Sequence, residues 1–260
     1  MTETNTLERI AAATRLRIAA AKQMVPLAEL RARAIAARTP LDFTAPFRGA
    51  AWGVIAEVKL ASPSEGDIGL GLDPVAVARE YAANGAFAIS VLTEPDFFKG
   101  SLDFLAAIRK AVEIPLLMKD FVLEEYQLYQ ARANGADAVL LIAALLGEDG
   151  LARLFPAAAA LGLTALIEVH DEPELRWALK SGGRLIGVNN RDLKTLKTDL
   201  NVSRRLAATA RVPGVTLVCE SGLRARGEIE ELAGLGYRGF LIGTHFIKSG
   251  RPGVALAELL

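Results

Sequence analysis

The sequence predicts a closed (β/α)8 barrel, in which eight parallel strands form a ring and helices cover its outside. Eight short apolar segments alternate with helical segments after residue 50, and a glycine stands at the turn from helix to strand in five places. Units of roughly 20 to 35 residues that repeat in this way are typical of such barrels. No break in composition divides the chain. We therefore predict one barrel domain over residues 1–260, in which residues 1–50 are an N-terminal helical extension.

Two helices are predicted before the barrel. Residues 7–24 are rich in alanine and arginine, and their apolar side chains recur at helical spacing. Residues 26–37 continue the pattern after Pro26, a residue type that is favoured in the first turn of a helix. Both helices precede the strand–helix repeat and are assigned to the extension.

The first predicted strand, residues 53–58, is largely apolar on both faces, as expected for a parallel strand that is covered by helices. Ser-Pro-Ser ends it. An open doubly wound sheet is the rival architecture, but a Gly-x-Gly-x-x-Gly turn would then be expected after this strand. The other strands are predicted at 87–92, 115–119, 138–142, 164–169, 185–189, 215–219 and 239–242.

Local start and stop signals predict helices between these strands. Asp73 and Pro74 supply a cap and a first-turn proline, and Ser101 precedes another helix. Glycine closes a helix by adopting the left-handed conformation. The closing glycines are Gly85, Gly135, Gly162, Gly182 and Gly236. Besides the helix that begins at Asp73, helices are predicted at 102–112, 124–133, 149–161, 172–180, 200–210, 224–235 and 252–260.

The composition limits the partners and the location of the protein. Thirty basic and thirty acidic residues cancel, without a basic stripe that contains aromatic residues, so we expect neither nucleic acid nor a membrane surface as partner. The longest apolar run, residues 138–146, is shorter than the ~18 residues of a membrane span, and we interpret it as a strand that continues into a loop. The single cysteine, Cys219, and a start without a signal sequence predict a cytoplasmic protein.

Polar residues stand at the ends of the predicted strands. Barrels of this class place their reacting groups at the carboxyl ends of the strands and in the loops that follow. Glu57 and Lys59 share one face of the first strand with Ile55, so this face carries chemistry while the other carries packing. We predict that these two residues converge on one mouth with Lys119, Glu168, Asn189, Ser221, Gly243 and Thr244.

Each of these residues also has a simpler interpretation. Lys119 and Asp120 would form an ordinary ion pair in a surface turn, and Glu168 would be an exposed carboxylate at the rim. Asn189 is a common turn former. The glycine-containing loops after strands seven and eight would be plain connections, but barrels build phosphate sites from backbone N–H groups at these two places.

Two lysines and two glutamates around one cavity indicate acid–base chemistry on an anionic substrate, because burial and pairing bring such groups toward neutrality. No His/Cys/Asp cluster has the spacing of metal ligands, and His170 and His245 have no evident ligand partners, so we predict no metal. Phe97, Phe98 and Phe121 lie on loops where an aromatic ring of a substrate could stack.

Taken together and in order, seven motifs resemble the indole-3-glycerol-phosphate synthase family of tryptophan biosynthesis. The resemblance runs over nearly the whole chain, and only the ordered set is specific. The motifs are Ile-Ala-Glu-Val-Lys-Leu-Ala-Ser-Pro-Ser (55–64), Ser-Val-Leu-Thr-Glu (90–94), Lys-Asp-Phe (119–121), Ile-Glu-Val-His (167–170), Gly-Val-Asn-Asn-Arg-Asp-Leu (187–193), Glu-Ser-Gly (220–222) and Leu-Ile-Gly-Thr (241–244).

This resemblance implies a TIM-barrel carboxy-lyase that needs no cofactor. Such an enzyme closes the indole ring of 1-(2-carboxyphenylamino)-1-deoxyribulose 5-phosphate and releases carbon dioxide and water. By resemblance, Lys119 is the general acid that protonates the ribulose carbonyl, and Glu168 is the base in the later dehydration. Lys59 holds the substrate carboxylate and is a second candidate proton donor. Glu57 and Asn189 orient the lysines and the substrate hydroxyls.

The resemblance also implies the binding residues for a phosphorylated small molecule. Arg191 and Phe121 match positions beside the anthranilate part of the pocket, and Phe97 is a further candidate for stacking. The positions that match the phosphate site are Ser62, Ser221, Gly222, Gly243 and Thr244. We expect a monomer or a weak homo-oligomer.

Two residues depart from the family pattern, and other functions stay open. Leu60 and Glu65 stand where the family frequently has basic residues, so the first loop is less positive beside the expected phosphate. An isomerase barrel of the same pathway would use a carboxylate with a thiol or a second carboxylate, but Cys219 lies in the wrong motif for it. A Schiff-base aldolase that uses Lys119, a chain engineered for another reaction, and a non-catalytic phosphate-binding barrel are the remaining alternatives.

Overall fold

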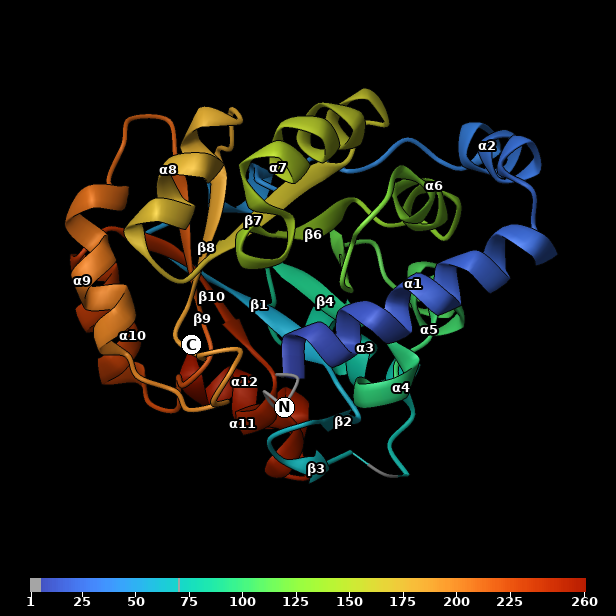
Figure 1. Ribbon diagram of the computed structural model, residues 1–260. Helices are drawn as coiled ribbons and strands as arrows, with labels where there is room; N and C mark the ends of the chain where they lie inside the picture. The colour runs from blue at the N-terminus through green and yellow to red at the C-terminus, as the bar shows by residue number, and fades with distance from the viewer. Residues whose placement is uncertain (1–5, 70) are drawn as a thin grey trace.

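The computed structural model describes residues 6–69 and 71–260, and it shows a closed barrel of eight parallel strands with helices outside it (Figure 1). Residues 1–5 of the predicted extension lie outside the described residues. The strands are β1 (Gly53–Val58), β4 (Ala88–Leu92), β5 (Leu116–Lys119), β6 (Ala138–Ile142), β7 (Thr164–Val169), β8 (Leu185–Asn189), β9 (Thr216–Glu220) and β10 (Tyr237–Ile242). The predicted fold class and all eight predicted strands are confirmed.

The ring closes because β1 pairs in parallel with both β4 and β10, with Gly53 beside Gly239 in the latter pair. Each strand otherwise pairs with its neighbours along the chain. Ile55 belongs to the apolar cluster inside the ring, whereas Val54 and Ala56 belong to the cluster between the ring and the helices. The strand parity predicted around Glu57 is therefore confirmed.

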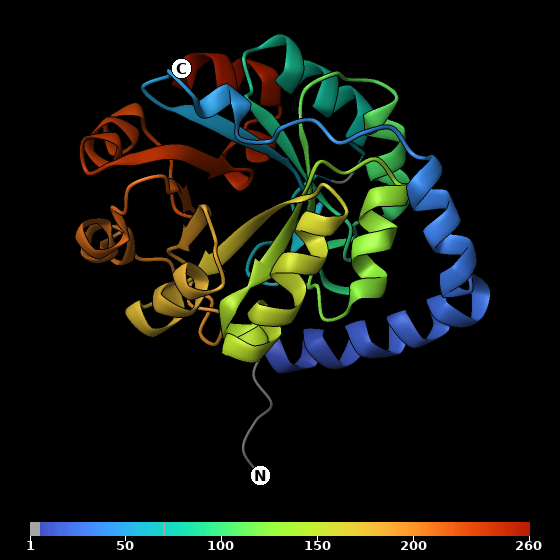
Figure 2. The ribbon, with the colours of Figure 1, turned by 90° about the horizontal axis from the view of Figure 1, so that it is seen from above.

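The helices alternate with the strands around the outside of the ring (Figure 2). They are α3 (Pro74–Ala83), α5 (Leu102–Arg109), α6 (Glu125–Ala133), α7 (Ala143–Ala160), α8 (Glu172–Lys180), α9 (Asn201–Ala210), α10 (Arg226–Gly234) and α12 (Pro252–Leu259). Four short elements lie in loops: η1 (Ala45–Phe47), the β2 (Ala61–Ser62) and β3 (Gly66–Asp67) hairpin, α4 (Pro95–Phe98) and α11 (Thr244–Lys248). None of the helices in the described part of the chain is both long and apolar enough to cross a membrane.

The predicted helix signals act as expected. The Asp73 side chain accepts a hydrogen bond from the Val75 N–H at 3.0 Å, which satisfies a free donor at the start of α3. All five glycines predicted to close helices have positive φ, for example 91° at Gly85. The Ala86 N–H then donates to the Tyr81 carbonyl at 3.1 Å and completes the turn into β4.

One predicted element is wrong. Residues 143–146 were expected to form a loop after β6, but they form the first turn of α7. Alanine and leucine have high helix propensity, so this stretch turns directly from strand to helix. Gly147, with φ 62° and ψ −176°, then kinks the element before the predicted helix continues.

The N-terminal extension contacts several parts of the barrel. Helices α1 (Thr6–Met24) and α2 (Leu27–Ala36) form a bent arm along one side of the ring (Figure 2), and α2 packs against α6. Arg17 of α1 donates to Asp120 at 2.6 Å, just after β5. Phe43 and Phe47 are buried inside the ring, where Phe47 packs edge-on against Phe87 at the start of β4. The extension thus fills the amino end of the barrel and reaches its carboxyl end.

A buried aspartate fastens the extension to the amino end of the barrel. Asp137 is fully buried and pairs with Arg38 at 2.7 Å and Arg109 at 3.0 Å. Its carboxylate also accepts hydrogen bonds from the N–H groups of Leu41 at 2.6 Å and Leu116 at 2.8 Å. A buried charge is tolerated because these four donors replace water.

We predict that Asp137→Asn lowers the free energy of unfolding by about 3 kcal/mol, because it leaves the largely buried Arg109 without its carboxylate and weakens the pair with the more exposed Arg38. Urea unfolding followed by circular dichroism measures this loss. Glu231→Gln is the matched control, since it breaks an exposed pair with Arg204 and should change little. Equal stability of the two variants would contradict the importance given to Asp137.

Candidate active site

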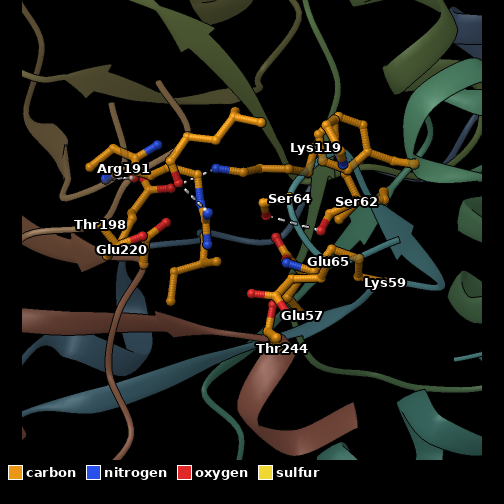
Figure 3. Close-up of a pocket in the computed structure, with 18 of the residues that line it drawn as sticks. Glu57, Lys59, Ser62, Ser64, Glu65, Lys119, Arg191, Thr198, Glu220 and Thr244 are labelled. Carbon is orange, nitrogen blue, oxygen red and sulfur yellow. Dashed lines mark hydrogen bonds and ion pairs between the residues drawn. The ribbon is translucent and has the colours of Figure 1, made fainter. Parts of the chain in front are cut away.

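A cavity of about 720 Å³ opens at the carboxyl ends of the strands. Thr6, Leu7 and Ile10 of α1 form part of its wall, so the extension helps to build the mouth. The lining includes all but one of the predicted site residues, namely Glu57, Lys59, Ser62, Lys119, Phe121, Glu168, Asn189, Arg191, Ser221, Gly222, Gly243 and Thr244. Figure 3 shows Glu57, Lys59, Lys119 and Glu220 gathered around this space.

The exception is Phe97. In the described part of the chain Phe98, not Phe97, lines the cavity, and its ring lies 6.0 Å from that of Phe121. Phe97 instead lies beneath the guanidinium of Arg9, 5.8 Å from its carbon. The two phenylalanines are adjacent on the short helix α4 and point in different directions, so only one of them faces the cavity. The buried Glu94 carboxylate caps the start of this helix.

Lys119 lies between two buried carboxylates. Its ammonium nitrogen is 3.1 Å from Glu168 Oε2 and 2.5 Å from Glu220 Oε2. Both carboxylate side chains are almost fully buried, with exposed fractions of 3% and 2%. The lysine reaches them from β5 across the mouth, because all three side chains point into the ring.

Lys59 forms a second ion pair, at 2.6 Å from Glu57 Oε1. Its side chain is 14% exposed, so the ammonium lies at the edge of the cavity. The Glu57 side chain fills the space beside Gly243, where an added Cβ would lie 2.7 Å from Oε1. Glycine at the end of β10 thus leaves room for the carboxylate that holds Lys59.

The pKa values of the central groups shift in different directions. Burial opposes the charge on Lys119, but Glu220 and Glu168 together raise its pKa above the usual value. Burial likewise opposes the charge on Glu168, yet Lys119, His170 and a hydrogen bond from Asn189 lower its pKa. Burial and the charge of Glu168 raise the pKa of Glu220 to about 7, despite its ion pair with Lys119. The lysine is therefore a charged acid beside one ionised base.

Glu220 is a site residue that the sequence prediction missed. The sequence predicts a strand that ends at Cys219 and places Ser221, in the loop after it, at the site. In the structure Cys219 faces the helices, while Val218 and Glu220 face the interior. A glutamate that ends a strand on the inner face was the available signal. Gly187 on β8 supports this placement, since an added Cβ there would lie 2.0 Å from Glu220 Oε1.

The turn after β9 is held in a strained conformation. Ser221 has φ 67°, in the left-handed region, and Gly222 follows with φ 88°. Asn190 is buried and donates from its side chain to the carbonyls of Glu220 and Ser221, at 2.9 and 3.1 Å. The asparagine therefore fixes the turn that presents Ser221 and Gly222 to the cavity.

The rim carries positive charge. Arg191, Arg224 and Lys248 line the cavity near the two loops that were predicted to bind phosphate. Arg191 donates to the Leu196 carbonyl at 2.8 Å, which holds its guanidinium against the loop. Glu65 forms an ion pair with Lys248, so the acidic departure from the family pattern is paired with a cation.

The site suits proton transfer on an anionic substrate. It combines a charged lysine, an ionised glutamate within hydrogen-bond distance, and a second lysine across the same cavity. Within the described residues, no three His, Cys, Asp or Glu side chains form a group that could hold a metal ion.

Comparisons with known proteins point to one family. A family model described as indole-3-glycerol phosphate synthase matches residues 7–259. The indole-3-glycerol phosphate synthase of Carboxydothermus hydrogenoformans is 45% identical over 261 residues, which span 98% of this chain and 99% of that protein. The protein of the same name from Mycobacterium avium is 45% identical over 264 residues, which span 100% of this chain and 95% of that protein.

Solved structures show the same fold at low identity. A crystal structure of 3-hexulose-6-phosphate synthase superposes with a TM-score of 0.64 and 17% identity, over 80% of this chain and 97% of that one. A thiamine phosphate pyrophosphorylase from Pyrococcus furiosus superposes with a TM-score of 0.59 and 18% identity, over 80% of this chain and 94% of that one. At these identities the likeness shows the barrel architecture alone.

We predict that Glu220→Gln changes how stability depends on pH. The raised pKa of Glu220 means that its ionisation disfavours the folded state, so the parent loses stability as the pH rises from about 4.5 to about 7. The variant lacks this loss, and should gain up to about 3 kcal/mol relative to the parent between pH 4.5 and 8. Urea unfolding over this pH range measures it.

Glu168→Gln is the control of opposite sign. Because the pKa of Glu168 is lowered in the folded state, its ionised carboxylate stabilises the fold at pH values above its pKa in the unfolded chain. That stability is lost as the pH falls. Removing this carboxyl should therefore weaken the protein most at neutral pH. If both variants show the same pH dependence, the two carboxylates do not differ as described.

Proposed function

This chain belongs to the indole-3-glycerol phosphate synthase family, a family of carboxy-lyases, and we propose that Lys119, Glu168 and Lys59 carry out its ring-closing reaction at the barrel mouth. The substrate is 1-(2-carboxyphenylamino)-1-deoxyribulose 5-phosphate, and the products are indole-3-glycerol phosphate, carbon dioxide and water. The observation that carries the assignment is the pairing of Lys119 with two buried carboxylates across a cavity from a second ammonium group.

The reaction requires two protons and releases one. The ring carbon that bears the carboxylate attacks the ribulose carbonyl carbon, and the carbonyl oxygen takes up a proton. Carbon dioxide then leaves and restores the aromatic ring. The new hydroxyl takes up a second proton and leaves as water, while the CH2 group between nitrogen and the former carbonyl carbon gives up one proton.

Lys119 supplies the first proton in this proposal. Its ammonium stays charged because Glu168 and Glu220 raise its pKa, so a proton is available where negative charge develops on the carbonyl oxygen. A positioned donor of this kind contributes typically ~10² to 10⁴-fold to the rate. Glu220 and Glu168 hold the ammonium in place from two sides.

Lys59 faces the carboxylate that leaves as carbon dioxide. Attack by the ring carbon disrupts aromaticity, and a fixed cation near the carboxylate holds that group in position for the attack. Glu57 orients the ammonium at 2.6 Å. Once carbon dioxide has left, Lys59 no longer contacts the substrate carboxylate, although its pair with Glu57 remains, and it is a candidate donor for the leaving hydroxyl, beside Lys119.

Glu168 accepts the proton from the CH2 group in the last step. Its pKa is lowered, so it is ionised near neutral pH and ready to act as a base. Asn189 hydrogen bonds to this carboxylate and also accepts from the Arg191 N–H at 3.0 Å. The proton then passes to Lys119, which lies 3.1 Å away.

In this proposal the phosphate binds in the loops after β9 and β10. Ser221, Gly222, Gly243 and Thr244 line this side of the cavity, and Ser62 lines it from the first loop. Ser221 and Gly222 lie in a tight turn with positive φ, and backbone N–H groups in turns can form a concave site for an anion. Binding the remote phosphate helps to orient the reacting ring and carbonyl.

The anthranilate ring is placed among apolar side chains. Phe98 and Phe121 lie with their ring centroids 6.0 Å apart and both line the cavity, as do Leu7 and Ile10 of α1. Arg191 lines the same cavity and is proposed to lie beside the anthranilate part. In this proposal Phe98 takes the stacking position that the sequence suggested for Phe97.

A Schiff-base mechanism at Lys119 is disfavoured by the same contacts. Such a mechanism needs a neutral amine, whereas two carboxylates hold this nitrogen as an ammonium. A single chain supplies every group assigned above, which supports a monomer or a weak homo-oligomer as the working form. A cytoplasmic location is part of the same proposal, and family membership supports it.

We predict that Lys119→Met lowers kcat at least ~10²-fold while KM stays within a few-fold, because the variant keeps the phosphate and carboxylate contacts but loses the proton donor. Indole fluorescence measures turnover of the carboxyphenylamino substrate. Lys110→Met, at the exposed end of α5, is the matched control and should turn over normally. Normal turnover of the Lys119 variant would refute the mechanism.

We also predict that Glu65→Gln lowers KM by about two- to fivefold, because it releases Lys248 toward the phosphate. The value of kcat should not change, since both residues are remote from the reacting atoms. Asp67→Asn is the control: Asp67 lies on the same hairpin and pairs with Lys99 instead. An unchanged or higher KM in the Glu65 variant would show that Lys248 does not contact the phosphate.

A further inference from the structure

His170 links the proposed base to the outside of the barrel. It directly follows β7, and its Nδ1 lies 3.0 Å from Glu174 Oε2 on α8. Its Nε2 lies 3.5 Å from Glu168 Oε1. In the described structure Nε2 is buried and has no hydrogen-bond partner, so the carboxylate of Glu168 is the group it faces.

The ring must carry a positive charge to satisfy both contacts. A neutral imidazole has one N–H and one lone pair, so one of its two nitrogens would meet a carboxylate oxygen without a proton between them. Burial opposes the charge, but the hydrogen bond to Glu174 and the charge of Glu168 raise the pKa of His170. The other charged groups that act on the ring, Glu220 and Asp192, are also acidic.

The Glu168 carboxylate bridges two proton carriers. Its Oε1 faces His170, and its Oε2 accepts a hydrogen bond from Lys119 at 3.1 Å. The His170 side chain is 17% exposed and that of Glu174 is 12% exposed, so both have contact with solvent. A proton can therefore pass from solvent to Lys119 along groups that are already in contact or nearly so.

The reaction creates a need for such a path. Both protons that it consumes go to the same oxygen atom, first as carbonyl and then as leaving hydroxyl. In the proposed mechanism Lys119 faces this oxygen. After it has donated one proton it is a neutral amine, and it must be protonated again before it can donate the second. The CH2 proton is released with or after the departure of water, too late to recharge the lysine. One proton per turnover must come from solvent.

We propose that His170 recharges Lys119 between ring closure and dehydration, with Glu174 holding the imidazole in place. The inference rests on the proposed function of Lys119 and Glu168. The Nε2–H bond of the imidazolium breaks as an O–H bond forms on Glu168, and that carboxyl passes its proton to the neutral Lys119 amine. His170 takes a new proton from solvent. His170 and Glu174 are thus positioning and relay residues and do not touch the substrate.

The test uses His170→Asn in single-turnover reactions that follow carbon dioxide and indole fluorescence separately. Asparagine keeps a donor for Glu174 but cannot carry a proton to Glu168. Carbon dioxide should form at nearly the parental rate, while indole should appear roughly tenfold more slowly or worse. Parental rates for both products, or equal slowing of both, would overturn the proposal, because a merely structural role does not separate the two steps.

Glu174→Gln provides a second variant with a smaller change. It removes a negative charge beside the ring and should lower the pKa of His170. The alkaline limb of the dehydration rate should then move to lower pH by about half a unit or more. Glu172→Gln is the matched control, because Glu172 lies on the same helix and pairs with Arg176 in solvent. A pH profile of the Glu174 variant that matches the control would count against the relay.

The result is separable from a failure of the proposed function. Lys119→Met should slow the release of both carbon dioxide and indole at least ~10²-fold, whatever the behaviour of His170→Asn. If Lys119→Met is inactive and His170→Asn is normal, Lys59 donates the second proton and the relay is wrong. If Lys119→Met releases carbon dioxide normally, the proposed function itself is wrong.

Discussion

The site depends on the balance of charge around Lys119, whose side chain is only 14% exposed. One ammonium lies within 3.1 Å of two carboxylates that are almost completely buried. Charging three groups this buried is energetically costly, so burial and mutual pairing determine which of them are ionised. The different pKa directions of Glu168 and Glu220 follow from this constraint, and they make one group a base while the other holds the lysine.

Residues without side chains make this balance sterically feasible. Gly187 on β8 lies beside Glu220, and Gly243, which directly follows β10, lies beside Glu57; a Cβ at either position would collide with the neighbouring glutamate side chain. The barrel interior is otherwise filled by large apolar residues such as Ile55 and Leu166. At the carboxyl end, glycines in an otherwise packed interior leave space for the reacting side chains. At the amino end, Phe43 and Phe47 fill the interior.

The extension belongs to the catalytic architecture as much as to the scaffold. Arg17 holds α1 to Asp120, the residue that follows Lys119, so the helix is tied to the segment that carries the acid. Ile10 lines the cavity, and Asp137 fixes the far end of the extension through Arg38. Exclusion of water by this wall strengthens the electrostatic interactions inside.

The order of the strands, the closing glycines and the inner face that bears Glu57, Lys59, Lys119 and Glu168 were determined by the sequence, because period-two alternation and helix caps are local properties. Contacts between distant segments were decided only by the tertiary structure. Glu220 contacts Lys119, and His170 lies between two carboxylates. Phe98 lines the cavity where the sequence suggested Phe97. These contacts depend on how neighbouring strands and helices pack. Strand parity alone indicates that Glu220 points inward, but no local pattern encodes which distant side chain each of these residues contacts.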